Sequence, residues 1–186
     1  MAHIHTKPGQ HDMTVAAHII RVDGKEPTAL LHMHKKLATL ICVGGHVELD
    51  ESPWDAVIHE IAEEAGYDIK DLQVLQPPLR IHQEGIDDIT IHPQPFFLDT
   101  HMNANTPDHW HTDTVYLFTT HSGPTLPLAA DESQDIRWLS RSEIEQLPDS
   151  QIFSNIRTTH LKAFDEFLTA WEPVPAGHFS TEKIAR

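Results

Sequence analysis

Three glutamates, Glu60, Glu63 and Glu64, lie close together in a segment whose apolar spacing predicts a helix. At about 100° per residue, their side chains fall within roughly one quadrant of the helix circumference. Grouped carboxylates repel one another, so one interpretation is a solvated acidic face. The other is a cation site, because hard divalent ions bind clustered carboxylate oxygens. The helix alone leaves both open.

The residues around this helix favour the cation site. Gly45 is followed, after five residues, by Glu51, and seven further residues lead to His59. The segment from His59 to Tyr67 reads His-Glu-Ile-Ala-Glu-Glu-Ala-Gly-Tyr. This pattern resembles the Nudix box, and Gly44-Gly45-His46-Val47-Glu48 looks like a common variant of its entrance. The matching residues are Gly45, Glu51, Glu60, Ile61, Glu63, Glu64 and Gly66, with Tyr67 as a looser match.

The resemblance implies a hydrolase that uses Mg²⁺ or Mn²⁺ to cleave a phosphoanhydride bond in a nucleoside diphosphate linked to another group. It implies that Glu60 and Glu64 bind the main cations and that the Gly44 carbonyl is a further ligand. Glu63 is then another ligand or the base that activates water, and Glu51 braces the start of the helix. Family members often place the base on a loop outside the box, which makes Asp131 and Glu132 further candidates.

His59 is the departure from the pattern, because the Nudix box normally has arginine there. Histidine lacks the planar fork of arginine and is mostly neutral at neutral pH. We therefore predict a weakened box, in which His59→Arg raises activity or leaves it unchanged. This departure keeps open a Nudix-like domain that binds nucleotide with little or no turnover. An enzyme of the isopentenyl-diphosphate isomerase type shares the fold and is a further alternative, against which the intact acidic helix argues.

A second group of candidate residues is His109, His111 and Asp113, which alternate along a predicted strand and so share one face. A polar strand end is the simpler interpretation. We favour a second metal site or a phosphate contact in the substrate cleft, because His-x-His is a common ligand spacing on strands. We expect His32, His34 and His92 at surface or rim positions. Cys42 precedes the glycines on an apolar strand, where a free cysteine is usually core.

The predicted elements position these residues within one α+β domain, an α/β/α sandwich. A mixed sheet of Nudix type would carry a central metal-binding helix and a C-terminal helix. Residues 13–172 form the domain, residues 1–12 a flexible N-terminus, and residues 173–186 a loose tail. Strands are expected at 13–22, 28–33, 39–43, 73–76, 89–99, 111–120 and 136–139, and helices at 52–65, 141–146 and 155–171. The apolar stripe of the last helix is either core or the surface of a homodimer.

The composition of the chain indicates which kind of ligand it binds and in which cellular compartment it works. The formal net charge of −15 argues against nucleic acid and favours a small nucleotide-type substrate whose charge is met by divalent cations. Cys42 is the only cysteine, which excludes an intrachain disulfide and favours the cytoplasm. No apolar run has the length that a membrane span requires.

Overall fold

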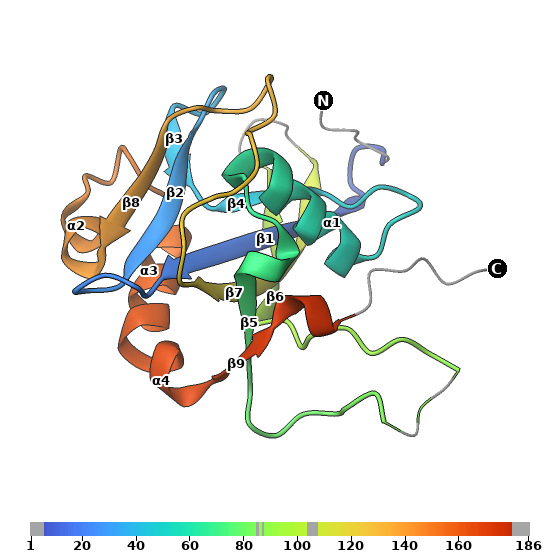
Figure 1. Ribbon diagram of the computed structural model, residues 1–186. Coiled ribbons are helices and arrows are strands. Elements are labelled where there is room, and N and C mark those ends of the chain that lie inside the picture. Colours follow the sequence, from blue (N-terminus) through green and yellow to red (C-terminus); the bar gives the residue numbers. More distant parts are fainter. Residues whose placement is uncertain (1–5, 85, 87, 104–107, 180–186) are drawn as a thin grey trace.

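Figure 1 shows the computed structural model, which describes residues 6–84, 86, 88–103 and 108–179. Within these ranges, nine strands form one mixed sheet. The strands are β1 (His11–Arg21), β2 (Thr28–His34), β3 (Thr39–Ile41), β4 (Val43–His46), β5 (Leu72–Gln76), β6 (Phe97–Met102), β7 (Trp110–Thr120), β8 (Ile136–Ser140) and β9 (Glu172–Pro175). The helices are α1 (Pro53–Glu60), η1 (Ile61–Ala65), η2 (Ile69–Asp71), α2 (Arg141–Gln146), α3 (Ser154–Lys162), η3 (Ala163–Phe167), α4 (Leu168–Ala170) and η4 (Ala176–His178).

β1 and β7 are the centre of the sheet and pair in parallel along their whole length. At one end of this pair, β4 lies beside β1 and β6 lies beside β7. At the other end, β2 takes the place of β4 and β5 takes the place of β6. The order β4–β1–β7–β6 therefore gives one end of the sheet its own set of facing side chains.

Both faces of the sheet are covered by helices, as the sequence predicts for a sandwich. Alternation along β1 sends Val15, Ala17 and Ile19 into a core with Trp54 and Val57 of α1. The opposite face holds a second core, which α2 and α3 cover; its members include Ile20, Leu31, Leu117, Ile144, Ile156 and Ala163. Figure 1 shows α1 on one side of the sheet and α3 on the other.

The helix that carries the three glutamates begins and ends as its sequence predicts. The Ser52 hydroxyl accepts a hydrogen bond from the Asp55 backbone N–H, and the Asp55 carboxylate accepts one from the Ser52 N–H. α1 then widens into the π-helical turn η1, a feature common at functional sites. Gly66 ends this turn with a left-handed φ of 70°, which glycine adopts without strain.

The prediction of an irregular strand from 89 to 99 is wrong for the first part of that range. Only Phe97–Met102 is a strand, so it begins later than predicted and ends three residues beyond the predicted end at 99. Pro93 and Pro95 have no N–H to give to a neighbouring strand, so the chain before Phe96 has no regular pairing.

The C-terminal segment is more ordered than predicted. The expected helix at 155–171 consists of α3, η3 and α4, and its apolar stripe packs into the second core. The prediction of a loose tail from residue 173 is wrong as far as the chain is described: β9 pairs with β5, Ala176 is fully buried, and Phe179 packs against Trp54. Pro173 and Pro175 are tolerated because β9 is an edge strand.

The N-terminal part of the described chain is also ordered. His11 and Asp12 belong to β1 rather than to a flexible N-terminus. No helix in the described part of the chain combines the length and the apolar character needed to cross a bilayer.

Candidate metal-binding active site

Glu60 lies against the backbone of β4 at Gly45. A Cβ atom on residue 45 would lie 2.5 Å from Cδ of Glu60 and closer still to Oε1. Any other residue would displace the carboxylate. The first glycine and the first helical glutamate of the box are therefore in direct contact, although they are fifteen positions apart in the sequence.

Glu64 is buried one helical turn further on, with 7% of the residue exposed. Its Oε2 accepts a hydrogen bond of 2.9 Å from the Gly44 backbone N–H. Burial raises the pKa of Glu64 to about 9, and the nearby charges of Glu60 and Glu132 act in the same direction. Burial likewise raises the pKa of Glu60 to about 7. The charge of His59 lowers the pKa of Glu60 but does not outweigh the effect of burial. No lysine or arginine in the described ranges pairs with either carboxylate.

His32 is part of this site, and the expectation that it lies at a surface or rim position is wrong. Only 1% of the residue is exposed, and its Nε2 lies 3.3 Å from the Cys42 carbonyl oxygen and 3.6 Å from Oε2 of Glu64. The sequence feature that indicates burial of His32 is its position two residues after Leu30, which places both side chains on the inward face of β2. His34, by contrast, is half-buried at the end of the strand.

Glu132 also joins the box carboxylates. It lies on the loop before β8, shares a hydrogen bond with Glu64, and adds its charge near both Glu60 and Glu64. Glu132 therefore lies with the glutamates of the box and apart from the group of His109 and His111. Asp131, the other loop candidate, is exposed, and its backbone carbonyl accepts a hydrogen bond from Lys35.

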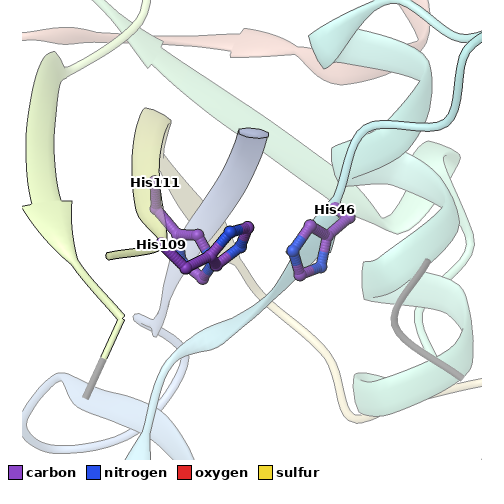
Figure 2. A group of neighbouring side chains, drawn as sticks. All are labelled: His46, His109 and His111. Atoms are coloured by element: carbon purple, nitrogen blue, oxygen red, sulfur yellow. The ribbon is translucent and has the colours of Figure 1, made fainter. Parts of the chain in front are cut away.

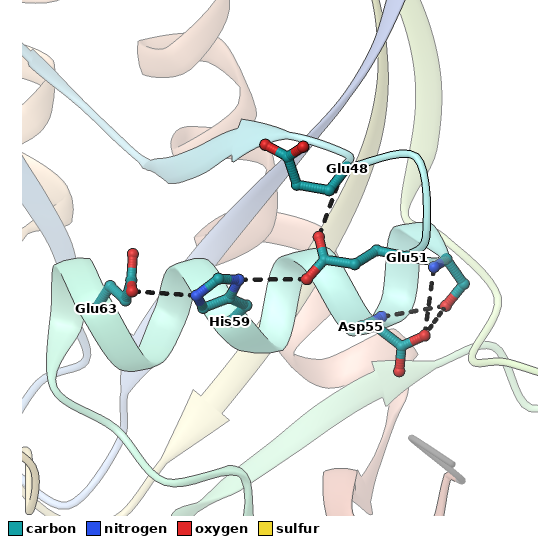
Figure 3. Close-up of polar contacts among 6 residues, drawn as sticks. Glu48, Glu51, Asp55, His59 and Glu63 are labelled. Atoms are coloured by element: carbon teal, nitrogen blue, oxygen red, sulfur yellow. Dashed lines mark hydrogen bonds and ion pairs between the residues drawn. The ribbon is translucent and has the colours of Figure 1, made fainter. Parts of the chain in front are cut away.

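Glu63 points away from this pair and belongs to a chain of surface contacts that centres on His59. Nε2 of His59 lies 3.0 Å from Oε1 of Glu63, and Nδ1 lies 3.3 Å from Oε1 of Glu51 (Figure 3). Oε2 of Glu51 in turn accepts a hydrogen bond from the Glu48 N–H. The single acidic face expected from helical periodicity is thus divided, with Glu60 and Glu64 inward and Glu63 exposed.

His59 therefore spans two carboxylates with its two ring nitrogens. Carboxylates only accept hydrogen bonds, so both contacts require the doubly protonated, charged ring. Partial burial lowers the pKa of His59, but the hydrogen bond to Glu63 and the charges of Glu63 and Glu51 outweigh it and raise the pKa above the ordinary histidine value. A cationic bridge between Glu51 and Glu63 is thus available without arginine.

These residues fit a hard divalent cation. Glu60 and Glu64 are largely buried carboxylates without a lysine or arginine partner, and a buried anion is costly unless it is paired or bound to metal. The box glutamates are not among the side chains whose ligand atoms already converge within 4.8 Å in the described part of the chain. Like charges repel, and a cation between them would draw these carboxylates together.

His111 and Asp113 do lie on one face of β7, and His109, which comes just before the strand, joins them together with histidines from neighbouring strands. Burial is the main cause that lowers the pKa of His111 to about 4, and His46, His101 and His109 add to it. The sequence analysis expected this group in the cleft beside the box glutamates. The alternation of β1 and β7 instead directs these side chains to the face of the sheet opposite the apolar stripe of α1.

Cys42 is a core residue, as expected. It packs at the edge of the second core, and burial, followed by the charges of Asp113 and Glu64, raises the pKa of its thiol to about 12. The thiol therefore stays protonated and is not a nucleophile at neutral pH.

The comparisons with known proteins agree with the fold and with the box. A family model described as NUDIX domain matches residues 12–161. The chain therefore belongs to the Nudix family. With hydrolases of that family among its structural neighbours, it is an enzyme of the Nudix pyrophosphohydrolase class. No curated protein sequence matches the chain.

Among solved structures, the chain is similar to a NUDIX family hydrolase from Clostridium perfringens, with 29% identity, a TM-score of 0.67, and coverage of 83% of this chain and 96% of that one. It is similar in fold to the Ap4A hydrolase of C. elegans, with 18% identity, a TM-score of 0.60, and coverage of 84% and 97%. The NUDIX domain of Shewanella oneidensis NrtR, complexed with ADP ribose, is also similar in fold, with 17% identity, a TM-score of 0.55, and coverage of 86% and 90%.

Proposed function

We propose that this chain uses Mg²⁺ or Mn²⁺ to hydrolyse the phosphoanhydride bond of a nucleoside diphosphate linked to another group. The observation that carries the proposal is the pair of largely buried carboxylates, Glu60 and Glu64, held against the backbone of Gly45 and Gly44 without a lysine or arginine partner. Such a pair is costly in the metal-free protein and becomes favourable beside a cation. A divalent ion would neutralise charge on the phosphates and make a bound water more acidic.

Within this proposal, Glu60 and Glu64 hold the ion, and the carbonyl of Gly44 is a further ligand. His32 positions Glu64 from behind, since its Nε2 lies 3.6 Å from Oε2 of that residue. His59 and Glu51 hold Glu63 at the rim as an outer ligand. Glu132 would be the base that accepts a proton from the attacking water, because it reaches the two buried glutamates from outside the helix that carries them.

The proposed class of substrate is supported by the ligands of structural neighbours and by the net charge of the chain. Ap4A, the substrate in the name of one neighbour, and ADP ribose, the ligand of another, both contain a nucleoside phosphate joined to a second group through phosphoanhydride bonds. Bound cations would allow a protein of net charge −15 to bind such an anion. The cytoplasmic location and a homodimer, expected from the sequence, stay predictions.

The test is a screen of nucleoside diphosphate sugars, dinucleoside polyphosphates and nucleoside triphosphates with Mg²⁺ and with Mn²⁺. We expect turnover of at least one compound that is lost without the ion. Glu60→Gln and Glu64→Gln should each lower kcat/KM by about 10²–10³-fold or more, as loss of one group that stabilises charge typically does. Glu166→Gln, an exposed position on η3, is the matched control.

Two results would contradict the proposal. Wild-type turnover in a folded Glu60→Gln or Glu64→Gln protein would exclude these residues as metal ligands. Tight binding of a nucleotide without turnover of any compound in the screen would identify a binding domain instead. For the base, Glu132→Gln should lower kcat while the affinity for Mn²⁺, measured by electron paramagnetic resonance, stays within a few-fold of wild type.

A further inference from the structure

A cluster of histidines lies at the end of the sheet where the strand order is β4–β1–β7–β6. Strand register aligns His46 of β4 with Thr14 of β1 and with Asp113 of β7. The next aligned row contains Asp12 of β1, His111 of β7 and His101 of β6. Four neighbouring strands therefore contribute ligand-type side chains to one face.

The cluster lies on the face of the sheet that α3 covers, at the end of that face away from α3. Asp12 and Thr14 alternate in phase with Ile20, which packs in the core beneath α3. Val15, Ala17 and Ile19 point the other way, toward α1. The histidine cluster and the apolar stripe of α1 thus project from opposite faces of the sheet. His46 lies in the box entrance, but its side chain points away from the face that carries the box glutamates.

We propose that His46, His109 and His111 form a second metal site, which binds a divalent transition ion such as Zn²⁺. One ring nitrogen from each lies within 4.8 Å of those of the other two, and Figure 2 shows the three rings gathered together. The ring centroids of His46 and His109 each lie 5.1 Å from that of His111. Three imidazoles are ligands that favour Zn²⁺, Co²⁺ or Ni²⁺ over Mg²⁺.

The carboxylate of Asp12 supports this assignment. Its Oδ2 lies 3.2 Å from Nε2 of His109 and 3.7 Å from Nε2 of His46. Asp12 and His109 are each 3% exposed. The 3.2 Å contact between Oδ2 and Nε2 is an ion pair only if the ring is protonated, and neither atom makes a hydrogen bond among the described residues. Two buried polar atoms without hydrogen bonds are costly, and a bound cation with a nearby carboxylate would satisfy them.

The geometry requires only side-chain adjustment. Ligand nitrogens at about 2.1 Å from a tetrahedral Zn²⁺ are roughly 3.4 Å apart, so rings now within 4.8 Å would close slightly around the ion. The strands that carry them are already paired, and the backbone need not move. A second possible grouping, His101, His111 and Asp113, shares His111. We prefer the three-histidine set because it contains the buried His109 beside Asp12.

The experiment is a titration of the full-length protein with Co²⁺, followed by visible absorption, in excess Mg²⁺ to occupy carboxylate sites. We expect saturable absorption bands of a nitrogen-ligated ion at one equivalent, displaced by Zn²⁺. His46→Ala and His111→Ala should abolish the bands or weaken binding by more than about 100-fold, whereas Asp12→Asn should weaken it by about 10–100-fold. His121→Ala, an exposed histidine beyond the other end of β7, is the matched control.

Thermal unfolding of each metal-free variant shows whether it folds, and Zn²⁺ should raise the Tm of the wild type but not of His111→Ala. Glu64→Gln should keep the Co²⁺ bands, so failure of the proposed hydrolase function would not affect this result. Absence of the bands in the wild type would overturn the proposal. So would bands that survive His46→Ala, or bands that are lost in His101→Ala and kept in His46→Ala.

Discussion

Gly45 and Glu60 are in contact so close that no side chain fits between them: a Cβ on residue 45 would lie 2.5 Å from Cδ of Glu60. The glycine therefore acts by leaving space for a carboxylate, and its φ is not in the left-handed region. Because the β4 backbone limits the movement of Glu60, the position of a metal ligand depends on a residue that has no side chain.

Gly45→Ala should therefore impair the enzyme more than it impairs the fold. The added methyl group displaces the Glu60 carboxylate, and we expect Mn²⁺ affinity and kcat/KM to fall by at least about 10-fold, as loss of a supporting contact does. Electron paramagnetic resonance and initial rates measure the two. Gly123→Ala is the control, since nothing lies within 4 Å of its added Cβ. Wild-type Mn²⁺ affinity in Gly45→Ala would show that Glu60 has another position available.

His59 should tolerate arginine and not an apolar residue. Its ring joins Glu51 to Glu63 at 3.3 Å and 3.0 Å, and the guanidinium of arginine supplies enough donors for both. We expect His59→Arg to retain or raise kcat/KM, and His59→Leu to lower it by about 10-fold or more. A large loss in a folded His59→Arg protein would show that the imidazole has a role of its own.

Glu64→Gln should stabilise the metal-free protein while it abolishes activity. Glutamine can still accept the hydrogen bond from the Gly44 N–H. It also removes the cost of protonating Glu64 on folding: with a pKa raised from 4.5 to about 9, this carboxyl is ionised in the unfolded chain at neutral pH and protonated in the folded, metal-free protein. Each kcal/mol of relief raises Tm by roughly 2–4 °C for a chain of this size. Differential scanning calorimetry in the presence of a chelator measures this. A lower Tm than wild type would mean that the charge of Glu64 is compensated without metal.

A buried pair of histidines beneath α3 should make the protein sensitive to acid. Nδ1 of His18 lies 3.2 Å from Nε2 of His160, and Nδ1 of His160 lies 2.9 Å from the Ile156 carbonyl oxygen. The His160 Nδ1–H donates to that carbonyl, which leaves its Nε2 as the acceptor for His18. Burial lowers the pKa of His160 to about 4, and burial with the neighbouring ring lowers that of His18 well below 6.5.

Because both folded-state pKa values are depressed, the unfolded chain binds more protons below about pH 6.5, and the free energy of unfolding falls as pH drops from 6.5 toward 4. His160 alone should account for about 3 kcal/mol over that range. Urea unfolding at pH 7, 6 and 5 measures the slope, which a folded His18→Leu/His160→Leu double variant should reduce. His121→Gln, which is exposed, should leave the slope unchanged. An equal slope in wild type and double variant would contradict the assignment.

Local patterns in the sequence were sufficient for most elements and for the box. Ser52, Pro53 and Asp55 define the start of α1, and Gly66 defines the end of η1, which continues it, because caps depend on residues within one turn. Runs of apolar residues predicted β1, β2 and β7, because a strand pattern is also carried by residues that are close together in the sequence. The edge strand β9 was missed, since its two prolines are tolerated only where no further strand needs their N–H.

Which residues come together in each site was decided by the tertiary structure. His32, Glu132 and Gly44 meet Glu64 from three separate segments, and only the folding of β2, β4 and the loop before β8 brings them together. Helical periodicity grouped Glu63 with Glu60 and Glu64, but it could not show that the sheet buries one side of the helix and leaves the other to solvent. His46 and His111 are 65 positions apart in the sequence and meet because both strands align with β1, a register that the whole sheet determines.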